Sequence, residues 1–200
     1  PRMEQLKIPH VMLMQNSVKD VLLSIKELGR VCDAEEEAAR MSEALSKEIA
    51  DIAEEAARTK NRPRVLLSVS RELSEPGISS FYAAGQDTFY NELIELAGGV
   101  NALPSGGAAY PVLSLEGLIK VNPDVIIDLI GDRNFYHSME AIEADSVFDR
   151  ERLLAQWTES AGTNAAAEGR VHILEGTAFL RPGLGMGRIL RTFARMIHPE

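Results

Sequence analysis

The sequence lacks the features that identify several classes of protein. Its one cysteine, Cys32, cannot form a disulfide within the chain, so cysteine gives no evidence about the redox compartment. No apolar run approaches the roughly 20 residues that a membrane-spanning helix needs. No signal peptide is present, and the chain opens at Pro1 inside an expected element, so we interpret it as a piece of a longer protein.

Basic residues are scarce as well. The chain has 21 Lys and Arg against 30 Asp and Glu, which gives a formal net charge of −9. Because an acidic surface repels phosphates, we expect no nucleic-acid partner and no basic patch that binds an anionic membrane. The hydrophobic fraction of 45% and the charged fraction of 26% are those of an ordinary globular protein.

Catalytic patterns are absent too. No G-x-S-x-G elbow, Walker A sequence or H-E-x-x-H pair occurs, and the four histidines are scattered, so we expect no metal site, no cofactor and no enzyme. The glycines of Gly183–Gly187 suggest a phosphate loop before a helix, but Pro182 separates them from the preceding strand and the chain ends soon after. A nucleotide-dependent α/β enzyme that uses this loop is the alternative function, because a helix start can bind an anion.

The most informative stretch that is present is SLEGLIKVNPDVII, from Ser114 to Ile127. Ser114 is a helix cap, and Glu116 follows it in the first turn, where the helix dipole favours an acid. Asn122-Pro123 ends the helix, because a residue before proline leaves the α region. Val125–Ile130 is then an apolar run with a single acid, typical of a parallel strand buried on both faces. The stretch therefore predicts an α/β layer protein.

Helices and strands alternate along the rest of the chain. A strand is predicted over Pro9–Met14, a helix capped by Asn16 or Ser17 is predicted to end at Gly29, and a long amphipathic helix is predicted over Ala34–Thr59. Further strands are predicted over 64–70 and 171–174, and further helices over 88–96, 146–157 and 187–197. The fold class that follows is α/β: a three-layer Rossmann-like lobe with a mostly parallel sheet, preceded by a long spanning helix.

Aromatic and arginine residues are concentrated in the loops that follow the strands. Open parallel sheets bind ligands beyond the carboxyl ends of their strands, and Phe, Tyr and Trp make up only 6% of the chain, so this concentration is informative. Such a rim suits a large planar or amphipathic ligand with anionic groups for the arginines, although each aromatic residue could instead pack beneath its own loop. The candidate ligand-binding residues are Arg71, Tyr82, Gly85, Phe89, Arg133, Phe135, Tyr136, Phe179 and Arg181.

A bare metal ion is the less favoured ligand for this rim. His137, Asp132 and Asp128 carry suitable donor atoms. However, Asp128 lies inside a predicted strand, and nothing in the sequence fixes a fourth ligand, which a closed tetrahedral site would need. We therefore favour an organic complex as the ligand.

Four segments follow one another in a fixed order: AGGVNAL, the SLEGLIKVNPDVII stretch, AAAEGRVHIL and the terminal FLRPGLGMGRILRTFARMIHPE. Together they resemble the C-terminal half of class III solute-binding proteins of ABC importers, which carry iron–siderophore complexes, haem or cobalamin. The resemblance covers the chain from about Ile8 to Glu200. It implies that residues 1–30 are the remnant end of an N-terminal lobe, residues 31–62 a spanning helix and residues 63–200 the C-terminal α/β lobe.

The resemblance also implies a function. The protein would be extracytoplasmic, would capture a metal–organic complex between two lobes, and would deliver it to an ABC permease in the membrane. Glu116, in its serine-x-glutamate context, would project from the lobe and pair with arginines of the permease. Leu184-Gly185 stands where family members often have Pro-Arg, so a cleft arginine is lost. Because most of the first lobe is missing, we expect exposed apolar surface and self-association of the chain.

Overall fold

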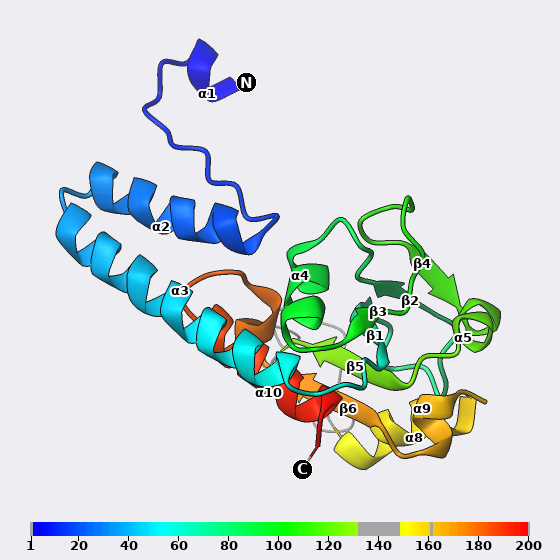
Figure 1. Cartoon of the computed structure of the whole chain (residues 1–200). Helices are drawn as coiled ribbons and strands as arrows, with labels where there is room; N and C mark the ends of the chain where they lie inside the picture. The colour runs from blue at the N-terminus through cyan, green and yellow to red at the C-terminus, as the bar shows by residue number, and fades with distance from the viewer. Residues whose placement is uncertain (1, 132–148, 161, 200) are drawn as a thin grey trace.

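A helical hairpin leads into an α/β lobe (Figure 1). The computed structural model describes residues 2–131, 149–160 and 162–199. The hairpin consists of α2 (Val18–Val31) and α3 (Glu35–Ala57), and a short helix, α1 (Arg2–Gln5), precedes it. The long helix predicted from the sequence is confirmed in α3, whose buried face packs against both α2 and the lobe.

Two predictions at the start of the chain are wrong. Pro9–Met14 forms no strand, because no described strand lies beside it to supply the hydrogen bonds. The helix that begins after Ser17 does have the predicted cap, since the Ser17 side chain accepts a hydrogen bond from the N–H of Asp20. It continues past Gly29 to Val31, however. Gly29 is needed for packing instead, because a Cβ there would overlap the Cβ of Ala38 on α3.

The lobe is built on a mixed sheet. Its strands are β1 (Arg64–Arg71), β2 (Ser80–Ala83), β3 (Val100–Asn101), β4 (Val112–Ser114), β5 (Val125–Ile130) and β6 (Val171–Glu175). The order is β4-β2-β1-β5-β6, and β3 also pairs with β1. The pairs β1–β3, β1–β5 and β5–β6 are parallel, whereas β1–β2 and β2–β4 are antiparallel. The α/β class is confirmed, and the two antiparallel strands at one edge, β2 and β4, are an addition to it.

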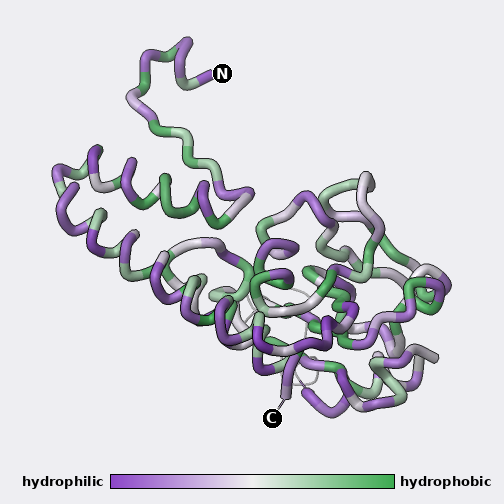
Figure 2. Tube along the Cα trace, viewed as in Figure 1, coloured by the Kyte–Doolittle hydropathy of each residue, from purple (hydrophilic) through white to green (hydrophobic). Residues whose placement is uncertain are grey.

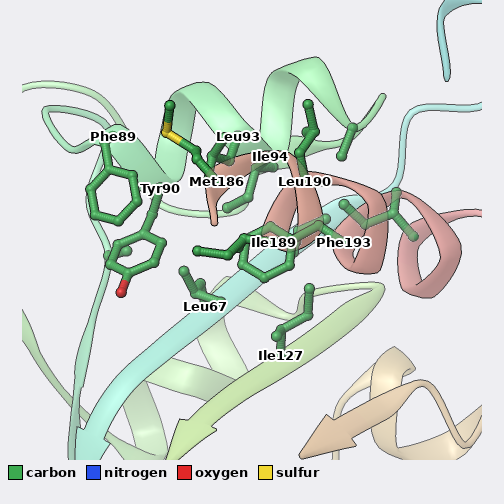
Figure 3. Packing of buried hydrophobic residues seen from close by; sticks show 14 of the residues in the cluster. Leu67, Phe89, Tyr90, Leu93, Ile94, Ile127, Met186, Ile189, Leu190 and Phe193 are labelled. Carbon is green, nitrogen blue, oxygen red and sulfur yellow. The ribbon is translucent and has the colours of Figure 1, made fainter. Parts of the chain in front are cut away.

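Helices cover both faces of the sheet, as a three-layer fold requires. They are α4 (Phe89–Leu96), α5 (Leu115–Val121), α8 (Arg150–Ser160), α9 (Asn164–Ala167) and α10 (Met186–Ile197), with a 3-10 turn, η1 (Thr177–Leu180). One apolar cluster joins α3, α4 and α10 to the sheet (Figure 3), and a second lies beneath α8 and α9. Figure 2 shows the apolar residues gathered in the strands and repeated along α2 and α3. None of the described helices has the length and apolar character needed to cross a membrane.

The predicted helix signals around β5 are confirmed in detail. Ser114 caps α5 by accepting a hydrogen bond from the N–H of Gly117. Asn122 ends α5 in the left-handed region, with a φ of 43°, directly before Pro123. All six residues of β5 are buried, as expected for a strand covered on both faces. The sequence around this unit therefore determines its local structure.

The glycine that ends α4 gives a test of local packing. Gly98 has a φ of +81°, and a Cβ there would lie 2.6 Å from Nε2 of His198. Gly98→Ala is therefore expected to lower the free energy of unfolding by about 1–2 kcal/mol from backbone strain alone, with a further loss from the His198 contact. Urea unfolding measures the change.

Gly106 is the matched control for this substitution. It has the same φ of +81°, but no heavy atom lies within 4 Å of the position that its Cβ would occupy. Gly106→Ala should therefore show only the strain of the left-handed backbone. Equal losses in the two variants would mean that the side chain of His198 does not restrict position 98.

Candidate functional site

The carboxyl ends of β1, β5 and β6 lie at one edge of the sheet, as the parallel pairing requires. Arg71 ends β1, Ile130 ends β5 and Glu175 ends β6. The N–H of Gly176 donates to the carbonyl of Ile130 over 2.9 Å, which holds the loop after β6 against β5. The segment after β5 begins at Gly131, and the predicted site residues Arg133, Phe135 and Tyr136 lie outside the described residues, as do Asp132 and His137.

Arg71, predicted to face ligand, points into the protein instead. An irregularity in the β1–β2 register between Ser68 and Ser70 shifts the alternation of β1, so that Arg71 lies on the same face as Asp128. Its Nε donates to Oδ2 of Asp128 over 2.7 Å, and its Nη1 donates to Oε1 of Gln156 over 2.7 Å. The side chain of Arg71 is only 1% exposed, so its guanidinium is in contact with protein rather than solvent.

Trp157 completes this buried cluster. Its ring lies beneath the guanidinium of Arg71, 5.5 Å from centroid to Cζ, and its Nε1 donates to Oδ2 of Asp128 over 2.9 Å. Both Trp157 and Gln156 belong to α8, so the cluster joins α8 to the carboxyl ends of β1 and β5. Arg71 therefore positions other parts of the rim.

The loop after β1 is held by the same helix. Arg152 of α8 donates from Nη2 to the carbonyl of Ser74 over 2.9 Å, and Gln156 donates to the carbonyl of Glu75. Within the loop, hydrogen bonds from the Ser74 hydroxyl and backbone N–H lower the pKa of Glu72. This part of the rim is consequently fixed by contacts with α8 before any ligand arrives.

Aromatic residues from three segments do meet at the other side of the rim. The rings of Phe89 and Tyr90 lie 4.0 Å apart, and the Tyr90 hydroxyl donates to the carbonyl of Phe179 over 3.0 Å. Burial raises the pKa of Tyr90, and the neighbouring Tyr110 contributes to the same shift. Arg188 places its Cζ 5.8 Å from the centre of the Phe179 ring. Of this group, Phe179, Tyr110 and Arg188 reach the surface, whereas Phe89 and Tyr90 are buried beneath them. Aromatic surface beside a cation suits a planar anionic ligand.

The predicted residues in this region differ in exposure. Phe89 is buried in the core beside Tyr90 (Figure 3), so it supports the rim from below. Phe179 is half-buried, Arg181 is exposed, and Tyr82 is 50% exposed on the outward face of β2. Gly85 supports the loop at 104–111: its N–H donates to the carbonyl of Ala109 over 2.7 Å, and a Cβ would lie 2.5 Å from the carbonyl oxygen of Ala108.

Sequence reasoning missed several residues that the structure brings to the site: Tyr110, Gln156, Trp157 and Arg188. Tyr110 is 44% exposed and lies immediately before Pro111, in a segment predicted as a plain loop. An aromatic residue in a glycine- and alanine-rich loop was the available signal for Tyr110. Nothing local marks Gln156, since its partner Arg71 lies 85 residues earlier in the chain.

The glycine-rich loop before α10 is closed to an anion. Gly185 is the cap residue of α10 and no side chain caps the helix start. The carboxylate of Glu48, from α3, lies where a Cβ on Gly187 would be, and it pairs with Arg191 over 3.3 Å. A carboxylate therefore already lies beside the positive end of this helix. Among the described residues, no group of three or more His, Cys, Asp and Glu side chains could hold a metal ion.

A groove of about 500 Å³ lies between α2, α3 and the loop at Pro182–Leu184. Apolar side chains of α2 and α3 line it, and Leu28, Met41 and Leu184 are exposed there. The self-association expected from the sequence stays a prediction, which sedimentation velocity would test. This groove is the apolar surface through which copies of the chain would associate.

Known protein families and relatives match this chain in sequence. The sequence profile of the family described as periplasmic binding protein matches residues 2–177. The high-affinity haem uptake system protein IsdE of Staphylococcus aureus is 28% identical over 114 residues, which cover 57% of this chain and 37% of that protein. The chain thus matches less than half the length of that curated relative.

Solved structures agree on the fold. An ABC transporter substrate-binding protein from Listeria monocytogenes matches with a TM-score of 0.77 at 21% identity, covering 100% of this chain and 71% of that chain. The structure of S. aureus IsdE complexed with haem matches with a TM-score of 0.71 at 22% identity, covering 98% of this chain and 70% of the other. The resemblance inferred from the four sequence segments is confirmed.

Proposed function

Because this chain belongs to the periplasmic binding protein family, a family of non-catalytic transport proteins, we propose that it is the solute-binding component of an ABC importer. In this proposal residues 63–200 form one lobe, α3 is the spanning helix, and the protein acts outside the cytoplasm. It captures a metal–organic complex at the carboxyl edge of the sheet and delivers it to a membrane permease. Glu116, exposed in the first turn of α5, is available for docking.

The observation that carries this proposal is the rim itself. On one side of the rim lies the loop after β1, which hydrogen bonds from α8 hold. On the other side lie Phe179 and the nearby Tyr110, with Arg188 against the ring of Phe179 and Arg181 two residues after it in the chain. Haem is the ligand we favour among haem, iron–siderophore complexes and cobalamin. Its flat ring suits aromatic walls and its propionates suit arginines, and relatives named for haem support the choice.

The nucleotide-dependent enzyme is the weaker candidate. A phosphate group at the start of α10 would have to displace the carboxylate of Glu48 from beside Gly187 and break its contact with Arg191. Two anions at one helix start repel each other, so the loop favours no nucleotide. Binding of haem at the rim does not require an anion at the start of α10.

Titration with haemin tests the proposal, with ferrichrome, cobalamin and ATP as competitors. Trp157 is the only tryptophan, so quenching of its emission reports binding from a single position. Arg181→Ala is expected to weaken haemin binding about tenfold, because a charge-assisted hydrogen bond is lost. Arg195→Ala, an exposed arginine at the far end of α10, is the control and should bind as the wild type does. Saturable binding of ATP without binding of haemin would refute the proposal.

A further inference from the structure

Two carboxylates join the hairpin to the lobe, and each lies at a helix start of the opposite part. Glu92, on α4 of the lobe, accepts a hydrogen bond through Oε2 from the N–H of Val18 over 2.7 Å. Val18 is the first residue of α2 in the hairpin. The first N–H groups of a helix have no partner inside it, and that end carries a partial positive charge. Glu92 therefore satisfies a free donor and places a negative charge where the helix dipole favours one.

Glu48 makes the converse contact, from the hairpin to the lobe. It belongs to α3, and its carboxylate lies where a Cβ of Gly187, the second residue of α10, would be. One turn further along α10, Arg191 places Nη2 3.3 Å from Oε1 of the same carboxylate. A hairpin carboxylate thus lies at the start of a lobe helix, and a lobe carboxylate at the start of a hairpin helix. Because the two contacts involve different helix pairs, they join the two parts at two separate points.

Gly187 is required by this carboxylate rather than by the backbone. Its φ is not positive, and within a helix glycine is less favourable than alanine. The three heavy atoms nearest to its Cβ position all belong to the Glu48 carboxyl group, with Oε1 at 2.8 Å. A side chain at position 187 would therefore displace the carboxylate of Glu48 from the start of α10.

The carboxylate contacts supply direction that the apolar contacts between the two parts lack. Ile49 and Ile52 of α3 share one apolar cluster with Phe193 of α10, so apolar burial already attaches the hairpin to the lobe. Apolar burial is non-directional, whereas a hydrogen bond weakens steeply when donor and acceptor are misaligned. The polar contacts of Glu48 and Glu92 consequently restrict the orientation in which the hairpin packs.

The same two lobe helices also hold an aromatic residue of the rim. Tyr90, two residues before Glu92 on α4, donates from its hydroxyl to the carbonyl of Phe179 over 3.0 Å. Arg188, next to Gly187 on α10, places its Cζ 5.8 Å from the centre of the Phe179 ring. The helices that contact the hairpin through the carboxylates therefore both contact Phe179.

We propose that Glu48 and Glu92 are positioning residues that together set the orientation of the hairpin on the lobe, and with it the position of Phe179. The effect on ligand binding rests on the function proposed above, whereas the effect on orientation does not. Loss of either contact leaves the apolar cluster intact, so the chain stays folded. The hairpin then takes a wider range of orientations.

The distance between two spin labels, measured without ligand, tests the orientation. Cys32 is the only cysteine, is exposed, and lies at the turn between α2 and α3, at the end of the hairpin far from the lobe (Figure 1). Ala167→Cys, at an exposed position on α9, supplies the second label. Glu92→Leu is expected to broaden the distance distribution. Glu92→Gln should restore it, because its amide oxygen can accept from Val18. Glu54→Leu is the matched control, since Glu54 pairs with Arg58 within α3.

A second pair of variants tests the contact of Glu48. By helix propensity alone Gly187→Ala would raise the melting temperature. Because the new Cβ displaces the Glu48 carboxylate, we expect this variant to broaden the distance distribution instead, with no rise in melting temperature. In a Glu48→Ala background the same substitution meets no carboxylate, so there it should raise the melting temperature. Such dependence on the background is the signature of two residues in contact.

The outcomes are distinct. Broader distributions for Glu92→Leu and Gly187→Ala, with Glu92→Gln and Glu54→Leu like the wild type, support the proposal. Wild-type distributions in both Glu92→Leu and Gly187→Ala overturn it, as does equal broadening by Glu54→Leu. Haemin binding by Glu92→Leu is expected to be about fivefold weaker, and unchanged haemin affinity despite a broader distribution would overturn the link to Phe179. A wild-type chain that binds no haemin refutes the proposed function, while the ligand-free distances still decide the orientation.

Discussion

Replacement of Arg71 by methionine is expected to lower the free energy of unfolding by about 3–5 kcal/mol, because it leaves the carboxylate of Asp128 buried without its cation. Methionine preserves most of the apolar stem of the arginine, so the loss comes from the missing charge and hydrogen bonds. The carboxylate of Asp128 is wholly buried, and its remaining described donor is Trp157. Urea unfolding followed by far-UV circular dichroism measures the effect.

A double-mutant cycle measures the interaction energy between Arg71 and Asp128 separately from the contacts that each residue makes with its surroundings. Asp128→Asn keeps an oxygen that can accept from Trp157 but removes the negative charge, so alone it strands the Arg71 cation. The double variant, Arg71→Met with Asp128→Asn, should recover part of the loss, because neither charge is then buried without a partner. Arg30→Met is the control, since Arg30 pairs with Glu27 at the surface with its side chain 62% exposed. A control loss below about 1 kcal/mol is expected. Equal losses for Arg30→Met and Arg71→Met would contradict the assignment of a buried pair.

Truncation of Phe193 to alanine is expected to cost about 3–5 kcal/mol, through lost transfer free energy and the cavity that it leaves. Phe193 is 0% exposed and lies on α10 in the apolar cluster that includes Ile49 and Ile52 of α3. Figure 3 shows its side chain among residues of α10 and the sheet. Because the same helix contacts α3 and α4, the cavity should weaken the attachment of the hairpin to the lobe.

Two spectroscopic probes distinguish destabilisation of the whole chain from local loss of helical structure in Phe193→Ala. Trp157 belongs to the apolar cluster on the other face of the sheet, so its fluorescence reports the lobe, whereas circular dichroism reports mainly helices. Arg195→Ala, exposed on the same helix, should change stability by no more than about 0.5 kcal/mol. A loss below about 1 kcal/mol for Phe193→Ala would indicate that α10 does not anchor the hairpin.

The elements that sequence reasoning predicted well are those with local signals. The cap at Ser114, the stop at Asn122 and the apolar run of β5 each depend on residues within one turn or one strand. The antiparallel pair β2–β4 was missed because its strands have four and three residues, too few to show an alternation. A strand was wrongly predicted over Pro9–Met14 because an apolar run alone says nothing about the presence of a neighbouring strand.

The candidate site was harder to predict, for a related reason. The rule that ligands bind beyond the carboxyl ends of parallel strands selects loops that the structure places at one edge of the sheet, but it does not give the directions of their side chains. Arg71 turns inward because of partners that lie 57 and 85 residues away in the sequence. Phe89 was counted as a rim residue, yet it begins α4 and is buried in the core beside Tyr90. These outcomes depend on tertiary contacts that no local pattern encodes.

The irregular register of β1 limits where residues can be inserted into this chain or deleted from it. Before Ser68 the even-numbered Leu66 faces α8, and beyond it the odd-numbered Arg71 does, so the strand contains two phases of alternation. Loss of one residue between them would rotate Arg71 to the opposite face, beneath α4, away from its carboxylate. The strand thus tolerates changes of side chain more readily than a change in residue number. Insertions and deletions should be confined to segments such as Gly106-Gly107, where no heavy atom lies within 4 Å of either Cβ position.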